Sequence, residues 1–576
     1  MEEHRRQLDI RSVPFSRYGS YLAFSYPQDG TKEFDGHMAV RVLYGAFSQQ
    51  ETYPIIPVND DGKPEETIAV SMSPWELDVT SETGEYSICF GDEEGFLLKS
   101  NSSVLITKTK AGSYDRVMGH MDGSFEIAGD DMALHVILRK GKAKDQSACP
   151  DNGFGSSRLE LLLSPEKGEL LAVITLTGLS PQKKEYGSYA LCRQTVKEEY
   201  LEFEKGIMNG IMNGLKGTDP AFEKAGREAA YVLWHSVLQP SGYIKRPVMV
   251  MTKNWMNLVW SWDYAFNGLA LVSSHPELAY GQFLAMADQQ DEYGAYPDAY
   301  QARTVIRSFV KPPVQGFILK KMFQIHDPGS EVKERLYRSV ASFTDWWMTY
   351  RVEENGIPTY QHGNDSGWDN ATVFRLGLPV QSPDLSAWLV LQMEFLEHTA
   401  RQLGWMSEAE AWKEKGENLL SKLLAYFVRE GRFEAVKIPE MEVVPSDSLI
   451  LYLPLILGER LPEKLRENLI SELLEKGHLA GPWGFASEPL DSMLFEEDGY
   501  WRGAVWPAAA MILVDALRQC GRQKEARFYA ERFCRLCAEN GFYENYSALD
   551  GRGLRDHGFT WTASVFLILL RDYVLE

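Results

Sequence analysis

The sequence predicts two domains, an N-terminal antiparallel β-sandwich followed by an all-α domain of the (α/α)6-barrel type. At 576 residues the chain is longer than one hydrophobic core usually organises. Period-two polarity dominates up to about residue 200, whereas the helical period dominates from residue 219 onward. We therefore predict a sandwich over 1–200, a linker over 201–218 and the barrel over 219–576.

Short strands are predicted throughout the first 200 residues. Alternating polarity and many β-branched residues mark segments at 38–42, 67–71, 86–90, 104–109, 134–138 and 170–176. Turn clusters rich in Gly, Asp and Asn separate them, as is typical of an antiparallel sandwich. No acid flanked by aromatic residues stands out here. We therefore interpret this part as structural, or as one edge of a site.

The remainder of the chain is predicted to be helical. Its apolar residues recur near the helical period in twelve stretches, several of which begin at Asp, Ser or Pro. These stretches are 219–238, 262–273, 276–290, 312–326, 330–351, 383–404, 406–429, 446–457, 462–475, 502–519, 522–539 and 559–574. Twelve helices joined by alternately short and long connections predict six hairpins that close into a ring.

The long connections are predicted to gather at one end of that ring. Short links lie near 274–275, 327–329, 405 and 520–521, and long ones span 291–311, 352–382, 476–501 and 540–558. Because successive helices alternate in direction, the four long loops open at the same end. Long loops in a compact domain are uncommon unless they are functional.

Composition excludes several classes of protein. A formal net charge of −22 argues against a nucleic-acid partner, which needs a basic surface. The longest apolar run, 449–457, is broken by Pro454 and is too short to span a membrane. The first thirteen residues lack the apolar core of a signal peptide, and six cysteines are too few for a disulfide framework. We therefore predict a cytoplasmic protein.

Acidic residues beside tryptophans are predicted to meet at the mouth of the ring. The acids are Asp263, Asp369, Asp498 and Glu544, and the indoles are Trp262, Trp368, Trp501 and Trp561. Aromatic rings pack against the C–H faces of sugars, and carboxylates accept from sugar hydroxyls. Glycosidic hydrolysis needs one carboxylic acid to protonate the leaving oxygen and a second carboxylate to activate water or attack carbon. This composition indicates a glycoside-cleaving pocket.

Each candidate also has a plain structural interpretation. Asp369 follows the glycine-rich turn at 363–367 and can cap the next helix, and Glu544 can be a surface residue of an exposed loop. Arg502 can bind substrate or pair with a neighbouring carboxylate. The nearest rivals of Glu544 are Asp498 and Asp550.

The helical part resembles the bacterial members of glycoside hydrolase family 63, the processing α-glucosidase family, and more distantly the trehalases. The resemblance covers about 242–574 and rests on the order and spacing of several matching segments. These are Trp262-Asp263, Pro312-Pro313, Gly367-Trp368-Asp369-Asn370, Tyr500-Trp501-Arg502-Gly503-Ala504-Val505-Trp506, Glu544-Asn545-Tyr546 and Phe559-Thr560-Trp561-Thr562-Ala563. It implies a β-sandwich before an (α/α)6 barrel and inversion at the anomeric carbon.

The resemblance also implies a role for each site residue. Asp369 corresponds to the general acid and Glu544 to the general base. The terminal sugar would be held by Trp262, Asp263, Trp501 and Arg502, to which we add Trp368, Asn370 and Trp561. The chain departs from the family in two respects. Lys311 precedes the Pro-Pro pair where the family often has Gln, and the residues around Asp365 are particular to a subgroup.

The sequence thus predicts an inverting, exo-acting α-glycosidase, specifically an α-glucosidase of short oligosaccharides or small glucosides. No organic cofactor and no metal ion are predicted, and the oligomeric state stays open. One alternative is a sugar epimerase on the same scaffold, which the eleven thinly spread histidines disfavour. The others are a non-catalytic carbohydrate-binding protein and a phosphorylase, for which no Gly- or Ser-rich anion nest is present.

Overall fold

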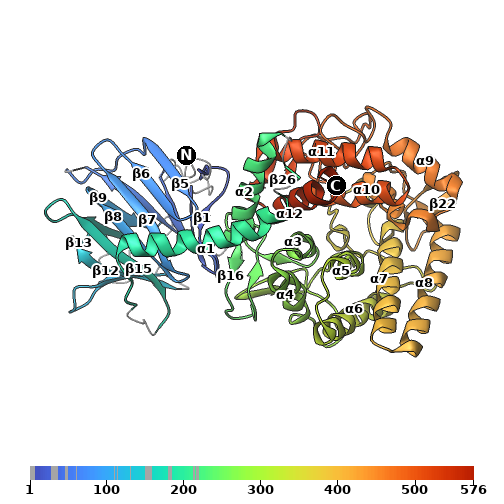
Figure 1. Cartoon of the computed structure of the whole chain (residues 1–576), viewed down its shortest axis with the longest axis horizontal. Helices are drawn as coiled ribbons and strands as arrows, with labels where there is room; N and C mark the ends of the chain where they lie inside the picture. The colour runs from blue at the N-terminus through green and yellow to red at the C-terminus, as the bar shows by residue number, and fades with distance from the viewer. Residues whose placement is uncertain are drawn as a thin grey trace.

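The chain folds into an N-terminal β region and a C-terminal helical region (Figure 1). The computed structural model describes residues 7–26, 37–45, 50–59, 61–108, 111–112, 114–129, 132–148, 158–179, 184–211, 214–215 and 219–575.

Two antiparallel sheets make up the β region. The first has the order β1 (Phe15–Ser16), β2 (Leu22–Ser25), β3 (Ala39–Val42), β4 (Glu51–Val58), β9 (Ser103–Thr107), β14 (Glu160–Ser164), β13 (Lys142–Asp145). The second has the order β10 (Arg116–Gly119), β11 (Phe125–Ala128), β12 (Ala133–Lys140), β15 (Leu170–Thr177), β8 (Gly95–Ser100), β7 (Glu85–Asp92), β6 (Glu76–Thr80), β5 (Ala69–Ser73). The six strand segments predicted from alternating polarity coincide with β3, β5, β7, β9, β12 and β15.

Aromatic side chains of the two sheets meet in a shared core. The ring of Phe24 on β2 lies 4.9 Å from that of Phe96 on β8 and 6.0 Å from that of Phe90 on β7. All three side chains are buried. Alternate residues of a strand point to one face, so each sheet contributes an apolar face to this core.

Helix α1 (Tyr189–Asn209) continues into the stretch predicted as a linker. The Ser188 hydroxyl caps it by accepting a hydrogen bond from the backbone N–H of Leu191. The helix contacts β7 of the β region and helix α2 of the helical region (Figure 1). Residues 201–209 are therefore helical, because their apolar side chains, including Phe203 and Ile207, are buried on one helix face. Of the predicted linker, residues 212, 213 and 216–218 lie outside the described residues.

Every predicted helical stretch contains a helix. They are α2 (Pro220–His235), α3 (Asp263–Leu271), α4 (Pro276–Ala287), α5 (Gln315–Ile325), α6 (Ser330–Tyr350), α7 (Pro383–Gln402), α8 (Met406–Phe427), η6 (Leu449–Arg460), α9 (Glu463–Leu473), α10 (Pro507–Gln519), α11 (Gln523–Asn540) and α12 (Thr560–Leu569), which continues as η7 (Leu570–Val574). The element η6 is a 3-10 helix with Pro454 inside it, as expected where proline removes a backbone N–H.

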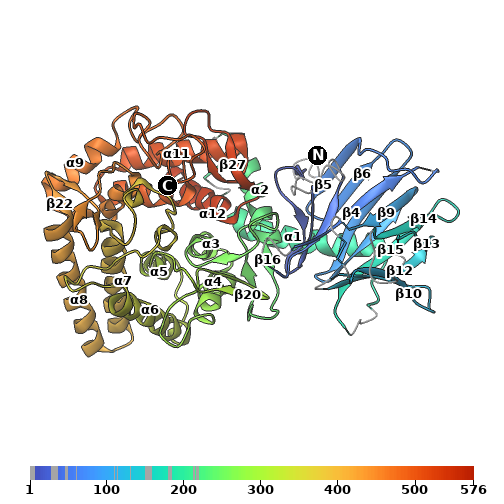
Figure 2. The same cartoon turned by 180° about the vertical axis from the view of Figure 1, so that it is seen from behind.

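Six helices form a closed ring of contacts. Helix α3 packs on α5, α5 on α7, α7 on η6, η6 on α10, α10 on α12, and α12 again on α3. A second set of helices contacts this ring from outside, as Figures 1 and 2 show from opposite sides: α2, α4, α6, α8, α9 and α11. Residues at or before the start of α3, α5, α7, α10 and α12 line one cavity, so these segments meet at one place in the helical region.

Hydrogen bonds join the β region to the helical region. The short strand β16 (Val237–Leu238) lies at the junction (Figure 2), where the N–H of Gly19 donates to the carbonyl of Val237 at 2.9 Å. The buried Lys253 ammonium donates to the Ser16 hydroxyl at 3.2 Å and to the carbonyls of Arg17 and Ser20. Burial holds the pKa of Lys253 well below its usual value.

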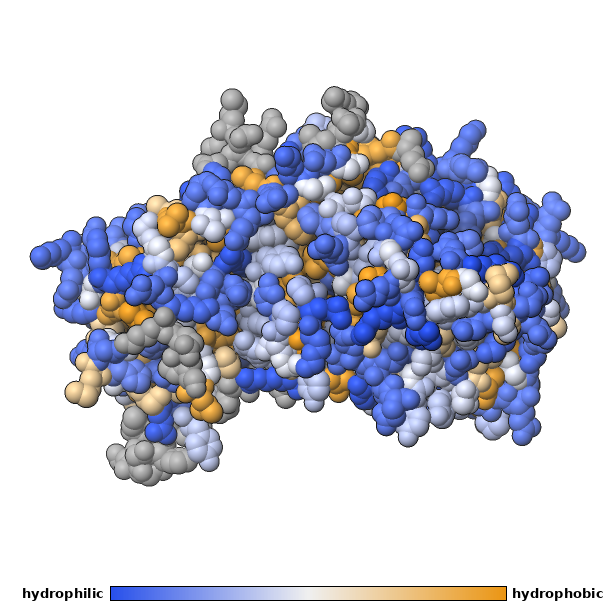
Figure 3. All heavy atoms as spheres, turned by 60° about the horizontal axis from the view of Figure 1, so that its bottom comes forward, coloured by the Kyte–Doolittle hydropathy of each residue, from blue (hydrophilic) through white to orange (hydrophobic). Residues whose placement is uncertain are grey.

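The face shown in Figure 3 is largely hydrophilic, with hydrophobic side chains in small, separate patches. Among the residues that the structure describes, no helix combines the length and the apolar character needed to cross a membrane.

The shared aromatic core predicts the result of a cavity-forming substitution. Phe24→Ala should lower the free energy of unfolding of the β region by about 3–5 kcal/mol, because the ring is fully buried between the two sheets. Ile68→Ala, at a residue with 63% exposure, should change it by less than about 0.5 kcal/mol. Urea denaturation followed by circular dichroism measures both, and equal effects would contradict this packing.

Candidate active site

A cavity of about 210 Å³ lies at the end of the helical region where the loops before the ring helices meet. It is lined by Met256, Trp260, Trp262, Asp263, Lys311, Asn364, Gly367, Asp369, Tyr500, Trp501, Trp506, Glu544, Phe559 and Trp561. Each of the four predicted long loops contributes to this lining. The volume is below the roughly 300–1,000 Å³ of sites for drug-sized ligands, so one small ring is a suitable occupant.

A tight turn holds Asp369 at the cavity wall. The 3-10 helix η4 (Gly363–Ser366) is anchored by the buried Asp365 carboxylate, which accepts from Arg351 at 3.0 Å and from three backbone N–H groups. Gly367 follows with φ of +71°, and a Cβ there would lie 2.8 Å from the indole of Trp262. Only glycine allows this conformation and close approach together.

The Asp369 side chain is 36% exposed, which leaves it accessible from the cavity. The alternative interpretation, a helix cap, differs from what the structure shows. The next helical segment, η5 (Thr372–Phe374), begins after Ala371 and has no side-chain cap.

The Lys311 ammonium lies among the carboxylates of the site. Its Nζ is 3.1 Å from Asp298 Oδ1 and 3.9 Å from Asp369 Oδ1. It also donates to the backbone and side-chain oxygens of Asn364 at 2.9 and 2.8 Å. Burial alone would lower the pKa of Lys311, but the carboxylates of Asp369, Asp298 and Asp263 outweigh it and hold that pKa above its usual value. Lys311 is therefore a permanent cation that offsets the acids.

Glu544 reaches the cavity from an irregularity in a β-hairpin. It lies on β26 (Tyr543–Tyr546), which pairs with β27 (Gly553–His557), and the register shifts between Tyr543 and Asn545. Such bulges redirect side chains. The Glu544 carboxyl accepts a hydrogen bond from the Tyr500 hydroxyl at 2.9 Å. Glu544 is 6% exposed, so it is not a surface residue as its alternative interpretation required.

Burial shifts the protonation of two acids in the cavity. It raises the pKa of Glu544 to about 8, although the Tyr500 hydroxyl opposes the shift. It raises the pKa of Asp263 to about 7, although the Lys311 ammonium opposes that shift. A cluster of acids with such pKa values in a cavity is typical of a catalytic site.

Tryptophan rings form much of the cavity wall. Trp501 and Trp506 stack with centroids 3.8 Å apart and planes 5° apart. Trp262 contacts the edge of Trp561 at 5.6 Å, and the Trp561 indole N–H donates to the Glu544 carbonyl. Flat indole surfaces next to carboxylates suit the apolar and polar faces of a sugar ring.

Three predicted substrate-binding residues lie outside this lining. Trp368 is buried behind Trp501, with the rings 4.3 Å apart. Asn370 bridges two loops, because its amide donates to the Gly499 carbonyl and its oxygen accepts from the Trp501 N–H. Arg502 pairs with Glu496 at 2.9 Å. In the structure all three support the loop that carries Trp501.

The two acids considered as alternatives to Glu544 form ion pairs outside the cavity. Asp498 pairs with Arg555 at 2.8 Å, and Asp550 pairs with Arg552 at 2.7 Å. Both acids are more than half exposed. Neither belongs to the cavity lining.

Sequence reasoning missed Tyr500 and Trp506 as parts of the cavity wall. Tyr500 has φ of +65°, an uncommon conformation for a residue with a side chain, and it brings the hydroxyl onto Glu544. The position of Tyr500 beside Trp501 was a usable signal, whereas the backbone conformation cannot be seen in the sequence.

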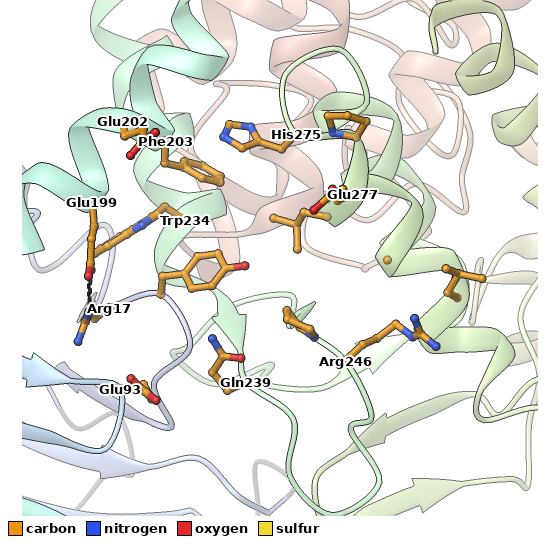
Figure 4. A pocket seen from close by; sticks show the side chains of 16 residues that line it. Arg17, Glu93, Glu199, Glu202, Phe203, Trp234, Gln239, Arg246, His275 and Glu277 are labelled. Carbon is orange, nitrogen blue, oxygen red and sulfur yellow. Dashed lines mark hydrogen bonds and ion pairs between the residues drawn. The ribbon is translucent and has the colours of Figure 1, made fainter. Parts of the chain in front are cut away.

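A larger cavity of about 920 Å³ lies between the β region and the helical region (Figure 4). Its lining includes Arg17, Glu199, Phe203 and Trp234 but none of the predicted site residues. Arg17 and Glu199 form an ion pair at one edge of it, at 2.7 Å. We therefore place the candidate active site in the smaller cavity.

The fold and the cavity define a protein with a ring of packed helices and a small cavity lined by carboxylates and tryptophans. A family model described as "Mannosylglycerate hydrolase MGH1-like glycoside hydrolase domain" matches residues 256–562, more than half of the chain. The chain belongs to this family of glycoside hydrolases. The matched range contains every residue that lines the smaller cavity.

Curated relatives match over short stretches. A mannosylglycerate hydrolase of Rubrobacter radiotolerans is 42% identical over 82 residues, which is 14% of this chain and 18% of that protein. A mannosylglycerate hydrolase of Thermus thermophilus is 31% identical over 121 residues, which is 21% of this chain and 28% of that protein. The matches thus span less than a third of either relative.

Solved structures agree in fold. A GH63 mannosylglycerate hydrolase from Thermus thermophilus, in complex with Tris and D-glycerate, has a TM-score of 0.52 at 21% identity, covering 59% of this chain and 98% of that chain. A bacterial glucoamylase complexed with acarbose has a TM-score of 0.66 at 11% identity, covering 98% of this chain and 94% of that chain. At these identities the likeness concerns the fold alone.

The raised pKa of Glu544 predicts a pH-dependent gain in stability when its charge is removed. Between its ordinary value of 4.5 and about 8, native Glu544 keeps a proton that the unfolded chain loses. Wild-type stability therefore falls as pH rises through this window. Glu544→Gln does not titrate, so its stability relative to wild type should rise by about 1 kcal/mol or more from pH 5 to pH 8.

Urea denaturation at a series of pH values measures this difference. Glu539→Gln, at an exposed residue of α11, is the control and should track wild type throughout. A Glu544→Gln difference that stays constant from pH 5 to pH 8 would contradict the raised pKa.

Proposed function

We propose that this protein is an inverting, exo-acting α-glycosidase whose helical region is an (α/α)6 barrel. The observation that carries the proposal is that Asp369 and Glu544 line one small cavity walled by tryptophans. The closed ring of helix contacts and the fold likeness to a bacterial glucoamylase support the barrel. We also keep the division into a β-sandwich over 1–200 and a catalytic domain over 219–576.

Asp369 is proposed as the general acid. Its side chain is accessible from the cavity, and the adjacent Lys311 holds it by charge while directing its own hydrogen bonds to Asn364. Asp369 protonates the glycosidic oxygen as the bond to the anomeric carbon breaks. Protonation allows the aglycone to leave as a neutral alcohol.

Glu544 is proposed as the general base on the opposite face of the sugar. It takes a proton from a water molecule, whose oxygen then attacks the anomeric carbon and inverts it. For this water to fit, the two carboxyl groups should be about 6.5–9.5 Å apart. The Tyr500 hydroxyl assists because its hydrogen bond favours the ionised form of Glu544.

The proposed substrate is a small α-glucoside with a neutral leaving group. A cavity of about 210 Å³ suits one terminal sugar, which favours exo action. Among the described lining residues only Lys311 carries a positive charge, and Asn364 and Asp298 already bond to it. A carboxylate-bearing aglycone would therefore find little compensation. The names of the curated relatives nevertheless make mannosylglycerate the second candidate substrate.

The epimerase alternative has less support. The described lining of the cavity contains no histidine, so proton transfer by imidazole lacks a candidate there. We further propose a cytoplasmic location, because six cysteines are too few for a disulfide framework.

The acid and base roles predict the anomer released and the effect of two variants. Proton NMR of wild type with a panel of α-glucosides, α-mannosides and mannosylglycerate should show β-configured sugar as the first product. Asp369→Asn and Glu544→Gln should each reduce kcat by about 10²–10⁴-fold, because each removes one proton transfer. Asp498→Asn is the matched control and should keep activity, since Asp498 lies outside the cavity lining. Release of the α-anomer would refute inversion, and no release from any glycoside would refute the glycosidase.

Tyr500 sets the pH range in which the base is ionised. Because the base must be deprotonated and the acid protonated, kcat/KM should follow a bell-shaped pH profile, and the limb that rises with pH reports the ionisation of Glu544. Tyr500→Phe removes a hydrogen bond that lowers the pKa of Glu544, so the rise should move to higher pH. The pH dependence of kcat/KM on an aryl α-glycoside measures the shift, with Tyr293→Phe at an exposed residue as control. An unmoved or downward shift would contradict this role.

A further inference from the structure

The β region contributes a buried arginine to the back of the active-site wall. Arg41 of β3 is 6% exposed, and its Nη1 donates to the side-chain oxygen of Asn254 at 2.8 Å. Gln50, just before β4, bonds to Arg41 and donates to the carbonyls of Asn254 and Trp255 at 3.3 Å. Two residues of the β region therefore hold the loop that leads to Met256, which lines the cavity.

Asn254 also hydrogen-bonds to the β26–β27 hairpin, which carries Glu544. Its amide Nδ2 donates to Asp556 Oδ1 at 2.7 Å. The other oxygen of Asp556 accepts from the backbone N–H groups of Trp255 and Met256 at 2.9 and 2.7 Å. Both Asn254 and Asp556 are nearly fully buried, so water cannot replace these bonds at low cost.

Asp556 lies in the irregular part of the hairpin, between the pairs Tyr543–His557 and Asn545–Leu554 that flank Glu544. It belongs to β27, and its backbone N–H hydrogen-bonds the Glu544 carboxyl. This is the place where the register of β26 and β27 shifts, so the ladder itself fixes Glu544 less firmly than a regular pair would. The orientation of the base therefore depends on what holds Asp556.

We propose that Arg41 of the β region is a positioning residue for the general base, acting through Asn254 and Asp556 on Glu544. The inference rests on the proposed glycosidase function and gives the β region a part in it. Arg41 does not touch the cavity, and its effect is to fix the backbone that presents Glu544 and Met256.

Lys253 and Asn257 also form hydrogen bonds between the helical region and the β region, but with other partners than Arg41. Lys253 donates to oxygens of residues 16–20, and Asn257 donates to the carbonyls of Leu43 and Gly45. These bonds join the two regions, whereas the bond from Arg41 leads to Asn254, which in turn donates to Asp556 on β27. Removing Arg41 would leave the buried side-chain oxygen of Asn254 without the donor that orients it, and Asn254 in turn donates to Asp556.

The test substitutes Arg41 and follows both structure and activity. Arg41→Gln should reduce kcat by about 10–100-fold with little change in KM, since small misplacement of a catalytic group has this effect. Arg41→Lys keeps a donor and should recover part of the loss. Arg158→Gln, at a 65% exposed arginine of the β region, is the matched control and should leave kcat unchanged.

Hydrogen–deuterium exchange gives a readout that does not require activity. In Arg41→Gln the amides of residues 254–257 and 554–557 should exchange faster than in wild type, while those of helix α7 should not. Where Arg41→Gln fails to fold, Gln50→Ala serves instead. It removes the bonds of a half-buried side chain to the same loop and should give the same pattern with a smaller fall in kcat.

The outcomes separate the two proposals. Wild-type kcat and wild-type exchange in both segments would overturn the positioning role while leaving the glycosidase intact. An inactive wild type would refute the glycosidase, and the exchange measurement would still decide whether Arg41 holds the hairpin.

A double variant of Arg41→Gln and Asn254→Ala should lose no more activity than the more impaired single variant, because both residues act through the same series of hydrogen bonds. Additive losses would overturn that series.

Discussion

Burial of several carboxylates around one ammonium is the constraint on which the rest of the structure depends. Lys311 lies between Asp298 and Asp369 and is held by both oxygens of Asn364. Charges this deeply buried are tolerated only when they are paired and hydrogen-bonded. The loops before α5 and α7 must therefore meet at this point, and the turn around Gly367 must be tight enough to bring Asp369 there.

Glu544, the proposed general base, is held in a different way from Asp369. Among the described residues no cation forms an ion pair with Glu544, so burial keeps the pKa of Glu544 raised and the hydrogen bond from the Tyr500 hydroxyl lowers it only in part. Its orientation comes from backbone and amide bonds that reach from the hairpin to Asn254 and on to the β region. Asp369 thus lies beside a cation, whereas Glu544 is held by hydrogen bonds.

Much of the fold and part of the site can be predicted from the sequence, and the reasons differ. Helical periodicity located every helix of the ring, because burial of one face is a local pattern. It left 201–209 as a linker, because the charged residues of α1 obscured its apolar face. Residue type and order indicated Asp369 and Glu544, but not that Arg502 turns to Glu496. The contacts of Tyr500 and Arg41 join residues far apart in the sequence and depend on backbone conformation and packing, which no local pattern encodes.

The central claim is that Asp369 and Glu544 act on opposite faces of one sugar in the small cavity. A crystal structure with a bound monosaccharide-like inhibitor such as an iminosugar tests this most directly. The account predicts the ring among Trp262, Trp501 and Trp561, with the two carboxyl groups about 6.5–9.5 Å apart on either side of the anomeric position. A ring bound instead in the cavity of Arg17 and Glu199, or carboxyl groups only about 5–5.5 Å apart, would contradict it.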